Sequence, residues 1–318
     1  MPIDYRRKTE QYSQAKQQVN EPKPQQFTIS SPKYSMDELI VTDELRDELQ
    51  TVVSAQQCYT QVFEQWNLQS VMKSRRNLFV NLYGAPGTGK TMAAHAIASS
   101  LGMKMICVNY ADIESKYVGE TSKNLTALFD YAAKQNVVIF FDEADALLSK
   151  RVTNMSNSTD VSVNQTRSVL LTLLNDYNGI VLFATNFISN YDPAFMRRIQ
   201  YHIKFTMPNE QLRRKLWRKY IPAEMPTNIN IDDIAARYSD ISGSDISTAV
   251  LKAALRAASN GSVYVQQQYF EDAVNQIKDS KTANSGGNVI VTKREVSEEY
   301  AMDQMKKSGV SLEKANTL

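Results

Sequence analysis

The stretch Gly84-Ala85-Pro86-Gly87-Thr88-Gly89-Lys90-Thr91 decides the fold, because it fits the pattern G-x-x-x-x-G-K-[ST]. Before it, residues 77–83 (NLFVNLY) are a short apolar run that predicts a buried strand. After it, residues 91–100 predict a helix. Glycines let backbone N–H groups turn inward around phosphate oxygens, and the N-terminus of the next helix favours the same negative charge. Strand, loop and helix together predict a phosphate-binding loop.

The side chains of this loop predict how ATP is bound. Lys90 is expected to contact the β- and γ-phosphates, and Thr91 to ligate Mg²⁺. The alternative is a glycine-rich turn with a structural role only. The residues expected to bind the nucleotide here are Gly84, Ala85, Pro86, Gly87, Thr88, Gly89, Lys90, Thr91 and Met92.

Strand and helix patterns alternate along this part of the chain. Fully apolar strands are typical of a parallel sheet that is covered on both faces. We therefore predict an α/β fold, a P-loop three-layer sandwich with a parallel sheet, followed by a small all-helical lid domain. The further expected strands are 105–109, 137–141, 180–184 and 203–205, and the expected lid helices are 212–220, 231–238, 243–259 and 266–277.

The chain divides by composition into four predicted segments. Residues 1–35 are rich in Gln, Lys, Ser and Pro, which predicts a disordered leader. An arm that orders on a neighbouring subunit or partner is the alternative. Residues 36–208 are expected to form the large α/β domain, 209–280 the helical lid domain, and 281–318 a linker with a polar C-terminal tail.

Composition excludes some classes of function. The net charge of the 318 residues is +2, which gives no argument for binding nucleic acid or a membrane surface. No apolar run approaches the roughly 20 residues that span a bilayer. The N-terminus lacks the apolar stretch of a signal peptide, and two distant cysteines suggest reduced thiols. We therefore expect a cytoplasmic protein.

Polar residues follow two more of the expected strands. Asp142 and Glu143 come directly after the apolar run 137–141. Asp142 can hold the Mg²⁺ water shell, and Glu143 can deprotonate the attacking water. Asn186 follows the strand 180–184 at the same edge of the sheet, where it can bind the γ-phosphate. A solvated strand end and a simple cap are the alternatives.

The order of these motifs, with Asp192-Pro193-Ala194-Phe195-Met196-Arg197-Arg198 after them, resembles the AAA family of AAA+ ATPases over residues 37–277. The resemblance implies a ring-shaped homo-hexamer with each nucleotide between two subunits. It also implies that Arg197 and Arg198 are arginine fingers, which offset the charge on the transferred phosphoryl group of the neighbour. Two arginines on a solvated surface loop are the alternative.

The resemblance extends to three further places. Residues 116–120 resemble the first pore loop, so Lys116, Tyr117 and Val118 would line a central channel and grip an extended polypeptide. A locally packed turn is the alternative. Gly243 and Ser244 resemble the sensor-2 region, without the arginine that many DNA-handling relatives carry there. The adenine is expected near Ile40 and Val41.

The expected function is that of an ATP-hydrolysing protein remodeller, an unfoldase or chaperone that threads client polypeptide through its pore. A HORMA-domain signalling protein is one possible client class, by resemblance to other members with a short N-terminus. One alternative is a nucleic-acid-associated loader, which would need a basic stripe or an added DNA-binding module. The other is a scaffold whose assembly ATP switches. Neither a nucleic acid nor a membrane is expected as a partner.

Overall fold

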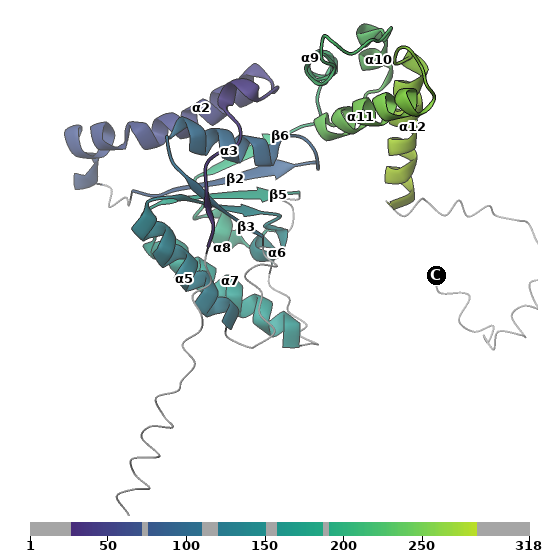
Figure 1. Ribbon diagram of the computed structural model, residues 1–318. Coiled ribbons are helices and arrows are strands. Elements are labelled where there is room, and N and C mark those ends of the chain that lie inside the picture. The colour runs from purple at the N-terminus through teal and green to yellow at the C-terminus, as the bar shows by residue number, and fades with distance from the viewer. Residues whose placement is uncertain (1–26, 72–75, 110–119, 151–157, 187–190, 285–318) are drawn as a thin grey trace, which may run out of the picture. The chain divides into compact units, whose positions relative to one another are not determined.

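The computed structural model of the chain describes residues 27–71, 76–109, 120–150, 158–186 and 191–284 (Figure 1). Two compact units are present, Met1–Val274 and Asn275–Leu318. The first unit contains a six-stranded sheet in the order β1-β3-β4-β5-β2-β6. Neighbouring strands are parallel except at one edge, where β1 runs antiparallel to β3. The bounds are Ile29–Ser30 for β1, Leu78–Gly84 for β2, Met105–Asn109 for β3, Val138–Asp142 for β4, Ile180–Thr185 for β5 and Tyr201–Phe205 for β6.

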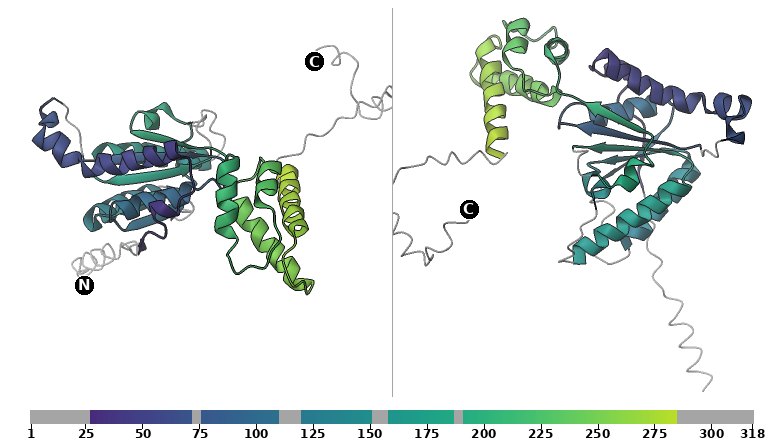
Figure 2. Two further views of the ribbon diagram at one scale, coloured as in Figure 1. Left: turned by 90° about the horizontal axis from the view of Figure 1, so that it is seen from above. Right: turned by 180° about the vertical axis from the view of Figure 1, so that it is seen from behind.

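Helices cover both faces of the sheet. On one face lie α2 (Asp43–Gln57) and α3 (Lys90–Ser100), and on the other α5 (Glu120–Gln135) and α7 (Ser158–Asp176) (Figures 1 and 2). Each face has its own apolar core, because the inward side chains of the strands alternate between the two layers. The predicted three-layer α/β sandwich is confirmed. Shorter helical segments are η1 (Met36–Glu38), η2 (Gln61–Gln65), η3 (Leu68–Ser70), α6 (Asp145–Leu148) and α8 (Pro193–Met196).

After β6 the described chain is helical. Side-chain caps set the starts of these helices: Asn209 accepts from Leu212 N at 2.9 Å, and Ser242 forms a capping box with Asp245. Trp217 and Phe270 form an edge-to-face contact in the helical core, with ring centroids 6.0 Å apart. The helices are α9 (Glu210–Tyr220), α10 (Ile231–Arg237), α11 (Gly243–Ser259) and α12 (Gln267–Asn284).

The end of the predicted leader is ordered, which corrects the boundary at residue 35. Ile29 and Ser30 pair with β3. Phe27 and Ile29 pack against the apolar core on the face of the sheet that α5 and α7 cover. Farther along, the backbone N–H of Lys33 donates to His95 Nδ1 on α3 at 3.2 Å. The segment is polar in composition, so its two apolar residues, Phe27 and Ile29, gave no strand signal. The short strand β1, which contains Ile29, pairs with β3, whose edge would otherwise be open. The other predicted domain borders remain predictions.

No helix among the described residues is both long and apolar enough to cross a bilayer.

Candidate nucleotide site

The loop between β2 and α3 is shaped by glycines. Gly84, Gly87 and Gly89 have φ angles of 148°, 75° and 105°, a region that side-chain-bearing residues rarely adopt. At Gly84 the reason is also steric, because an added Cβ would lie 2.0 Å from the backbone oxygen of Phe205. Gly89 is the N-cap of α3, so the loop leads directly into the N-terminus of that helix.

Lys90 ties the loop to the end of a second strand. Its Nζ donates to the backbone oxygens of Gly84 and Ala85, at 2.7 and 2.9 Å, and to Asn186 Oδ1 at 3.1 Å. Only 8% of the residue is exposed. Burial lowers the pKa of Lys90, and the nearby carboxylates of Asp142 and Asp145 oppose that shift. The predicted meeting of Lys90 and Asn186 at one sheet edge is present.

A third strand end completes the polar cluster. Thr91 Oγ1 donates to Asp142 Oδ2 at 3.0 Å, and Asp142 is the last residue of β4. Glu143 follows with an exposed side chain and a φ of 51°, which is uncommon for a residue other than glycine. Its backbone N–H donates to Asp142 Oδ1 at 3.0 Å. The sharp turn therefore ends the strand and leaves the Glu143 carboxylate accessible.

Asp145 is a member of this cluster that the sequence analysis did not find. Both of its carboxylate oxygens accept from Asn186 N, at 3.1 and 3.2 Å. The contact fixes the backbone of Asn186 while its side chain remains with Lys90. The sequence does place a third acidic residue three positions after Asp142. Because Asp145 begins α6, however, the sequence alone does not show toward which group its side chain points.

A pocket of about 340 Å³ adjoins the loop, a volume within the usual range of small-molecule sites. The predicted residues Ile40, Val41, Gly243 and Ser244 all line it, together with residues 87–92 of the loop. Helix α9 and further residues of α11 supply walls that the sequence did not indicate. These additional lining residues are Leu212, Leu216, Lys219, Tyr220, Ser247 and Thr248.

Direct contacts join the helical wall to the rest of this pocket. The backbone N–H of Ser244 donates to Gly87 O at 3.2 Å, and Lys219 Nζ donates to the backbone oxygen of Glu38. The Cβ of an alanine at position 87 would lie 2.5 Å from Ser242 Oγ. Gly87 thus allows the loop and the start of α11 to approach closely.

The two predicted arginine fingers differ in their surroundings. Arg198 Nε donates to Asn175 Oδ1 at 2.7 Å, and its Nη1 donates to Ala194 O at 2.8 Å. The side chain of Arg197 is exposed and has no hydrogen bond or ion pair among the described residues. Neither arginine lines the pocket of its own chain. The predicted pore residues Lys116, Tyr117 and Val118 lie outside the described residues.

Comparison with known proteins agrees with this geometry. The model of the family described as "ATPase family associated with various cellular activities (AAA)" matches residues 80–207. Residues 80–207 of the chain form a domain of the AAA family. This AAA protein is 34% identical over 219 residues to the 26S proteasome regulatory subunit 8 homolog of Saccharomyces cerevisiae, covering 65% of this chain and 53% of the relative. The resemblance drawn from the motifs is confirmed, and membership of an ATPase family implies nucleotide binding.

Other relatives extend the comparison. The ATP-dependent zinc metalloprotease FtsH of Lachnoclostridium phytofermentans is 32% identical over 212 residues, 64% of this chain and 37% of the relative. The ATPase family gene 2 protein of Schizosaccharomyces pombe is 34% identical over 184 residues, 56% of this chain and 23% of the relative. The AAA chain spans about half the length of the proteasome subunits that it matches.

Proposed function

We propose that this AAA protein hydrolyses ATP with Mg²⁺ and, as a homo-hexameric ring, uses the reaction to remodel client proteins in the cytoplasm. The observation that carries the proposal is the convergence of three strand ends beside one pocket. Lys90 and Asn186 meet there at 3.1 Å, and Thr91 and Asp142 meet at 3.0 Å.

Each group at this convergence has a proposed task. Lys90 binds the β- and γ-phosphates. Thr91 and Asp142 supply a hydroxyl and a carboxylate oxygen side by side, the type of ligand that Mg²⁺ prefers. Glu143 accepts a proton from the attacking water, and Asn186, oriented by Asp145, donates a hydrogen bond to the γ-phosphate. When bound, Mg²⁺ neutralises charge on the phosphate oxygens.

The rest of the pocket suits a nucleoside. Ile40 and Val41 on one side, and Gly243 and Ser244 on the other, are proposed to enclose the adenine and ribose. Leu216 of α9 adds an apolar side chain to the lining of the pocket. This placement uses the loop for the phosphates and the apolar end of the pocket for the base.

We propose that Arg197 acts on the nucleotide of the next subunit. Its side chain is exposed, has no hydrogen bond or ion pair among the described residues and does not line the pocket of its own chain. Its guanidinium can bind a group on a neighbouring chain without first breaking a hydrogen bond or ion pair to the described residues of its own chain. Arg198 is held by Asn175 on α7, so it is proposed to fix the direction of α8 as well as to add positive charge.

The client is proposed to be a polypeptide. Relatives of the chain include proteins named as proteasome regulatory subunits and as a protease. We propose that Lys116, Tyr117 and Val118 contact the client in the central channel, because an aromatic face binds an extended chain with little regard to its sequence. A HORMA-domain client remains a prediction from resemblance.

The hydrolytic site is tested with two variants of the full chain. Lys90→Ala is expected to lose ATP binding, because the buried cation at the loop is removed. Glu143→Gln is expected to bind ATP normally and to lose hydrolysis by a factor of about 10² to 10⁴, the usual contribution of a general base. Binding of a fluorescent ATP analogue and phosphate release measure the two steps.

The matched control is Glu224→Gln, the same change at an exposed position that does not line the pocket. It is expected to retain full activity. Hydrolysis that survives both Lys90→Ala and Glu143→Gln would contradict the assignment of the site. Stimulation of ATPase activity by DNA, with no response to unfolded protein, would contradict the proposed client class.

A further inference from the structure

A polar cluster is buried in the apolar core on the face of the sheet that α5 and α7 cover. Asn81 on β2, Thr185 on β5 and Tyr191 are 0%, 1% and 5% exposed. Thr185 Oγ1 donates to Asn81 Oδ1 at 3.2 Å, the Tyr191 hydroxyl hydrogen-bonds Thr185 Oγ1, and it lies 3.4 Å from Asn81 Oδ1. The three side chains form a short hydrogen-bonded chain that joins three parts of the fold.

Stability alone does not account for this cluster. Burying hydroxyl and amide groups costs free energy that their hydrogen bonds only offset, and an apolar set of the same size would fill the space without that cost. Asn81 Nδ2 also has no hydrogen-bond partner in the described part of the chain. What the cluster does provide is direction, because hydrogen bonds fix orientation in a way that apolar contacts do not.

The position of the cluster shows what it can orient. Thr185 immediately precedes Asn186, the residue that contacts Lys90. Tyr191 immediately precedes Asp192, the N-cap of α8, whose carboxylate accepts from Ala194 N at 2.8 Å. The Tyr191 hydroxyl is therefore a side-chain link between the end of β5 and the start of α8.

Helix α8 is only four residues long, so its direction depends on what holds its two ends. Arg198 and the buried Phe195 hold the far end. The Arg197 side chain has no hydrogen bond or ion pair among the described residues, so the backbone at the end of α8 sets the region that its guanidinium can reach. Tyr191 holds the near end, together with the hydrogen bond from Asp192 N to Leu148 O at 3.0 Å.

We propose that Tyr191 is a positioning residue: through Thr185 and Asn81, its hydroxyl fixes the start of α8 and so directs Arg197 toward the nucleotide of the neighbouring subunit. The inference rests on the proposed ring ATPase. The reacting phosphate is contacted by Arg197, and Tyr191 acts only through it.

The first test is Tyr191→Phe, which removes one oxygen and leaves Thr185 and Asn81 hydrogen-bonded to each other. The kcat for ATP hydrolysis is expected to fall between about tenfold and about a hundredfold, because a misdirected catalytic group loses orientation. The KM for ATP is expected to stay within about twofold, because the pocket is unchanged.

The matched control is Tyr177→Phe. Tyr177 belongs to the same core cluster, is 7% exposed, and, like Tyr191, has a pKa raised by burial to about 12. It lies in the turn before β5, at the opposite end of that strand from Thr185. Its kcat is expected to match that of the wild type. An equal loss of kcat in Tyr191→Phe and Tyr177→Phe would overturn the inference, because the loss would then come from disturbed packing of the shared core.

The deciding test adds Tyr191→Phe to two backgrounds. If Tyr191 acts through Arg197, adding Tyr191→Phe to Arg197→Ala lowers kcat by less than about twofold. Adding Tyr191→Phe to Asn186→Ala instead lowers kcat by the same factor as in the wild type. Full additivity with Arg197→Ala would overturn the inference, and so would wild-type kcat in Tyr191→Phe itself. Wild-type kcat in Arg197→Ala alone would instead contradict the proposed function.

Folding is checked by thermal unfolding and by the size of the assembly. If Tyr191→Phe melts well below the wild type, the triple variant Asn81→Leu, Thr185→Val, Tyr191→Phe replaces the whole cluster with apolar groups. A stable triple variant with low kcat and unchanged KM supports the inference. A stable triple variant with wild-type kcat overturns it.

Discussion

At the scale of single residues, Gly84 shows how closely the loop is bound to the sheet. It pairs with Phe205 of β6, has a φ of 148°, and leaves only 2.0 Å between an added Cβ and the Phe205 oxygen. Because that neighbour is backbone, it cannot rotate away. We expect Gly84→Ala to lower the free energy of unfolding by more than about 3 kcal/mol, measured by chemical denaturation.

Gly102→Ala is the control for this prediction. Gly102 also has a positive φ, of 66°, but an added Cβ would meet nothing within 4 Å. Only the left-handed backbone is then penalised, by about 1–2 kcal/mol. Equal losses in the two variants would show that the contact with Phe205 does not matter.

The two histidines of the chain predict how stability depends on pH. Burial lowers the pKa of both His95 and His202 below the ordinary value of 6.5; near His95, Lys33 adds to the shift and Asp142 opposes it. As the pH falls through 6.5, the unfolded chain binds these protons before the folded chain does. Stability is therefore complete above pH 6.5 and is lost as the pH falls toward the folded pKa values.

Thermal unfolding between pH 7.5 and 5.5 measures this effect. The exposed carboxylates with shifted pKa values, Glu38 and Glu44, titrate below 4.5 and so lie outside the window. In the double variant His95→Gln, His202→Gln, the melting temperature should change much less over the same range. A wild-type melting temperature that rises on acidification would contradict the sign.

The residues that could be predicted are those whose neighbours in the sequence define their role. Lys90, Asp142 and Asn186 each follow a recognisable strand, and parallel strands bring such ends together. Asp145 and Lys219 could not be assigned in this way, because their roles depend on the direction of a helix. Likewise, Arg197 and Arg198 are adjacent in one motif, and they differ in the structure because Arg198 contacts Asn175 on α7 and the backbone oxygen of Ala194.

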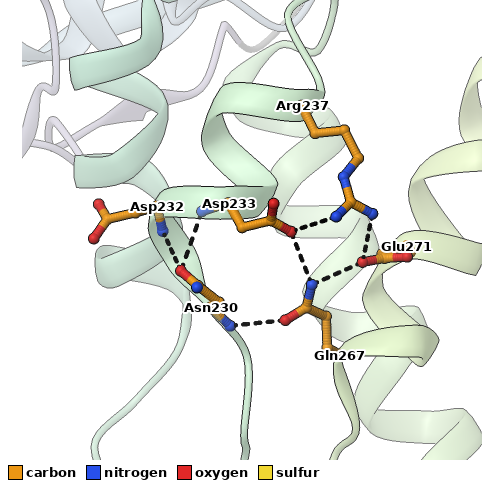
Figure 3. Close-up of polar contacts among 6 residues, drawn as sticks. All are labelled: Asn230, Asp232, Asp233, Arg237, Gln267 and Glu271. Carbon is orange, nitrogen blue, oxygen red and sulfur yellow. Dashed lines mark hydrogen bonds and ion pairs between the residues drawn. The ribbon is translucent and has the colours of Figure 1, made fainter.

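At the scale of elements, a polar network fastens the start of α12 to α10 (Figure 3). Gln267 Nε2 donates to Asp233 Oδ2 at 3.0 Å and to Glu271 Oε1 at 2.8 Å, and its Oε1 accepts from Asn230 N. Arg237 joins the same two carboxylates from the other side. The network places one positive charge and an amide donor against two neighbouring carboxylates, and it fixes where α12 begins.

Gln267→Ala is therefore expected to lower the free energy of unfolding by about 1 kcal/mol, because the two carboxylates and the Asn230 N–H lose a half-buried partner. The adjacent Gln268 provides the control, since within the described residues its side chain hydrogen-bonds only to Asp272 on its own helix. Gln268→Ala should change stability by less than about 0.5 kcal/mol. Chemical denaturation compares the two, and a reversed order would contradict the network's role.

Among the elements, strands that form apolar runs were predicted, and the two-residue strand at the sheet edge was not. The strands β4 and β5 are apolar up to their last residue, β2 is apolar except for Asn81, and all three were predicted close to their observed bounds. The two-residue strand β1 carries no periodic signal, and it forms only because β3 presents an open edge. The walls that α9 and α11 give the pocket also depend on tertiary packing, which no local pattern encodes.

At the scale of the whole molecule, one chain provides the complete pocket but leaves Arg197 outside it. We therefore expect ATP binding to be independent of assembly and ATP hydrolysis to require it. A single chain has every described group that is proposed to hold the nucleotide. The group proposed to complete hydrolysis has to come from a neighbour, so the hydrolytic unit is at least a pair of chains.

This separation predicts that dilution lowers the specific ATPase activity and leaves ATP binding per chain unchanged. Phosphate release and binding of a fluorescent ATP analogue are measured over the same series of concentrations, with sedimentation reporting the assembly. Arg197→Ala is the control: because it lacks the group that assembly supplies, its residual activity should not change on dilution. A dissociated wild-type monomer with full specific activity would contradict catalysis between chains, while a site that binds and hydrolyses ATP within one chain would remain.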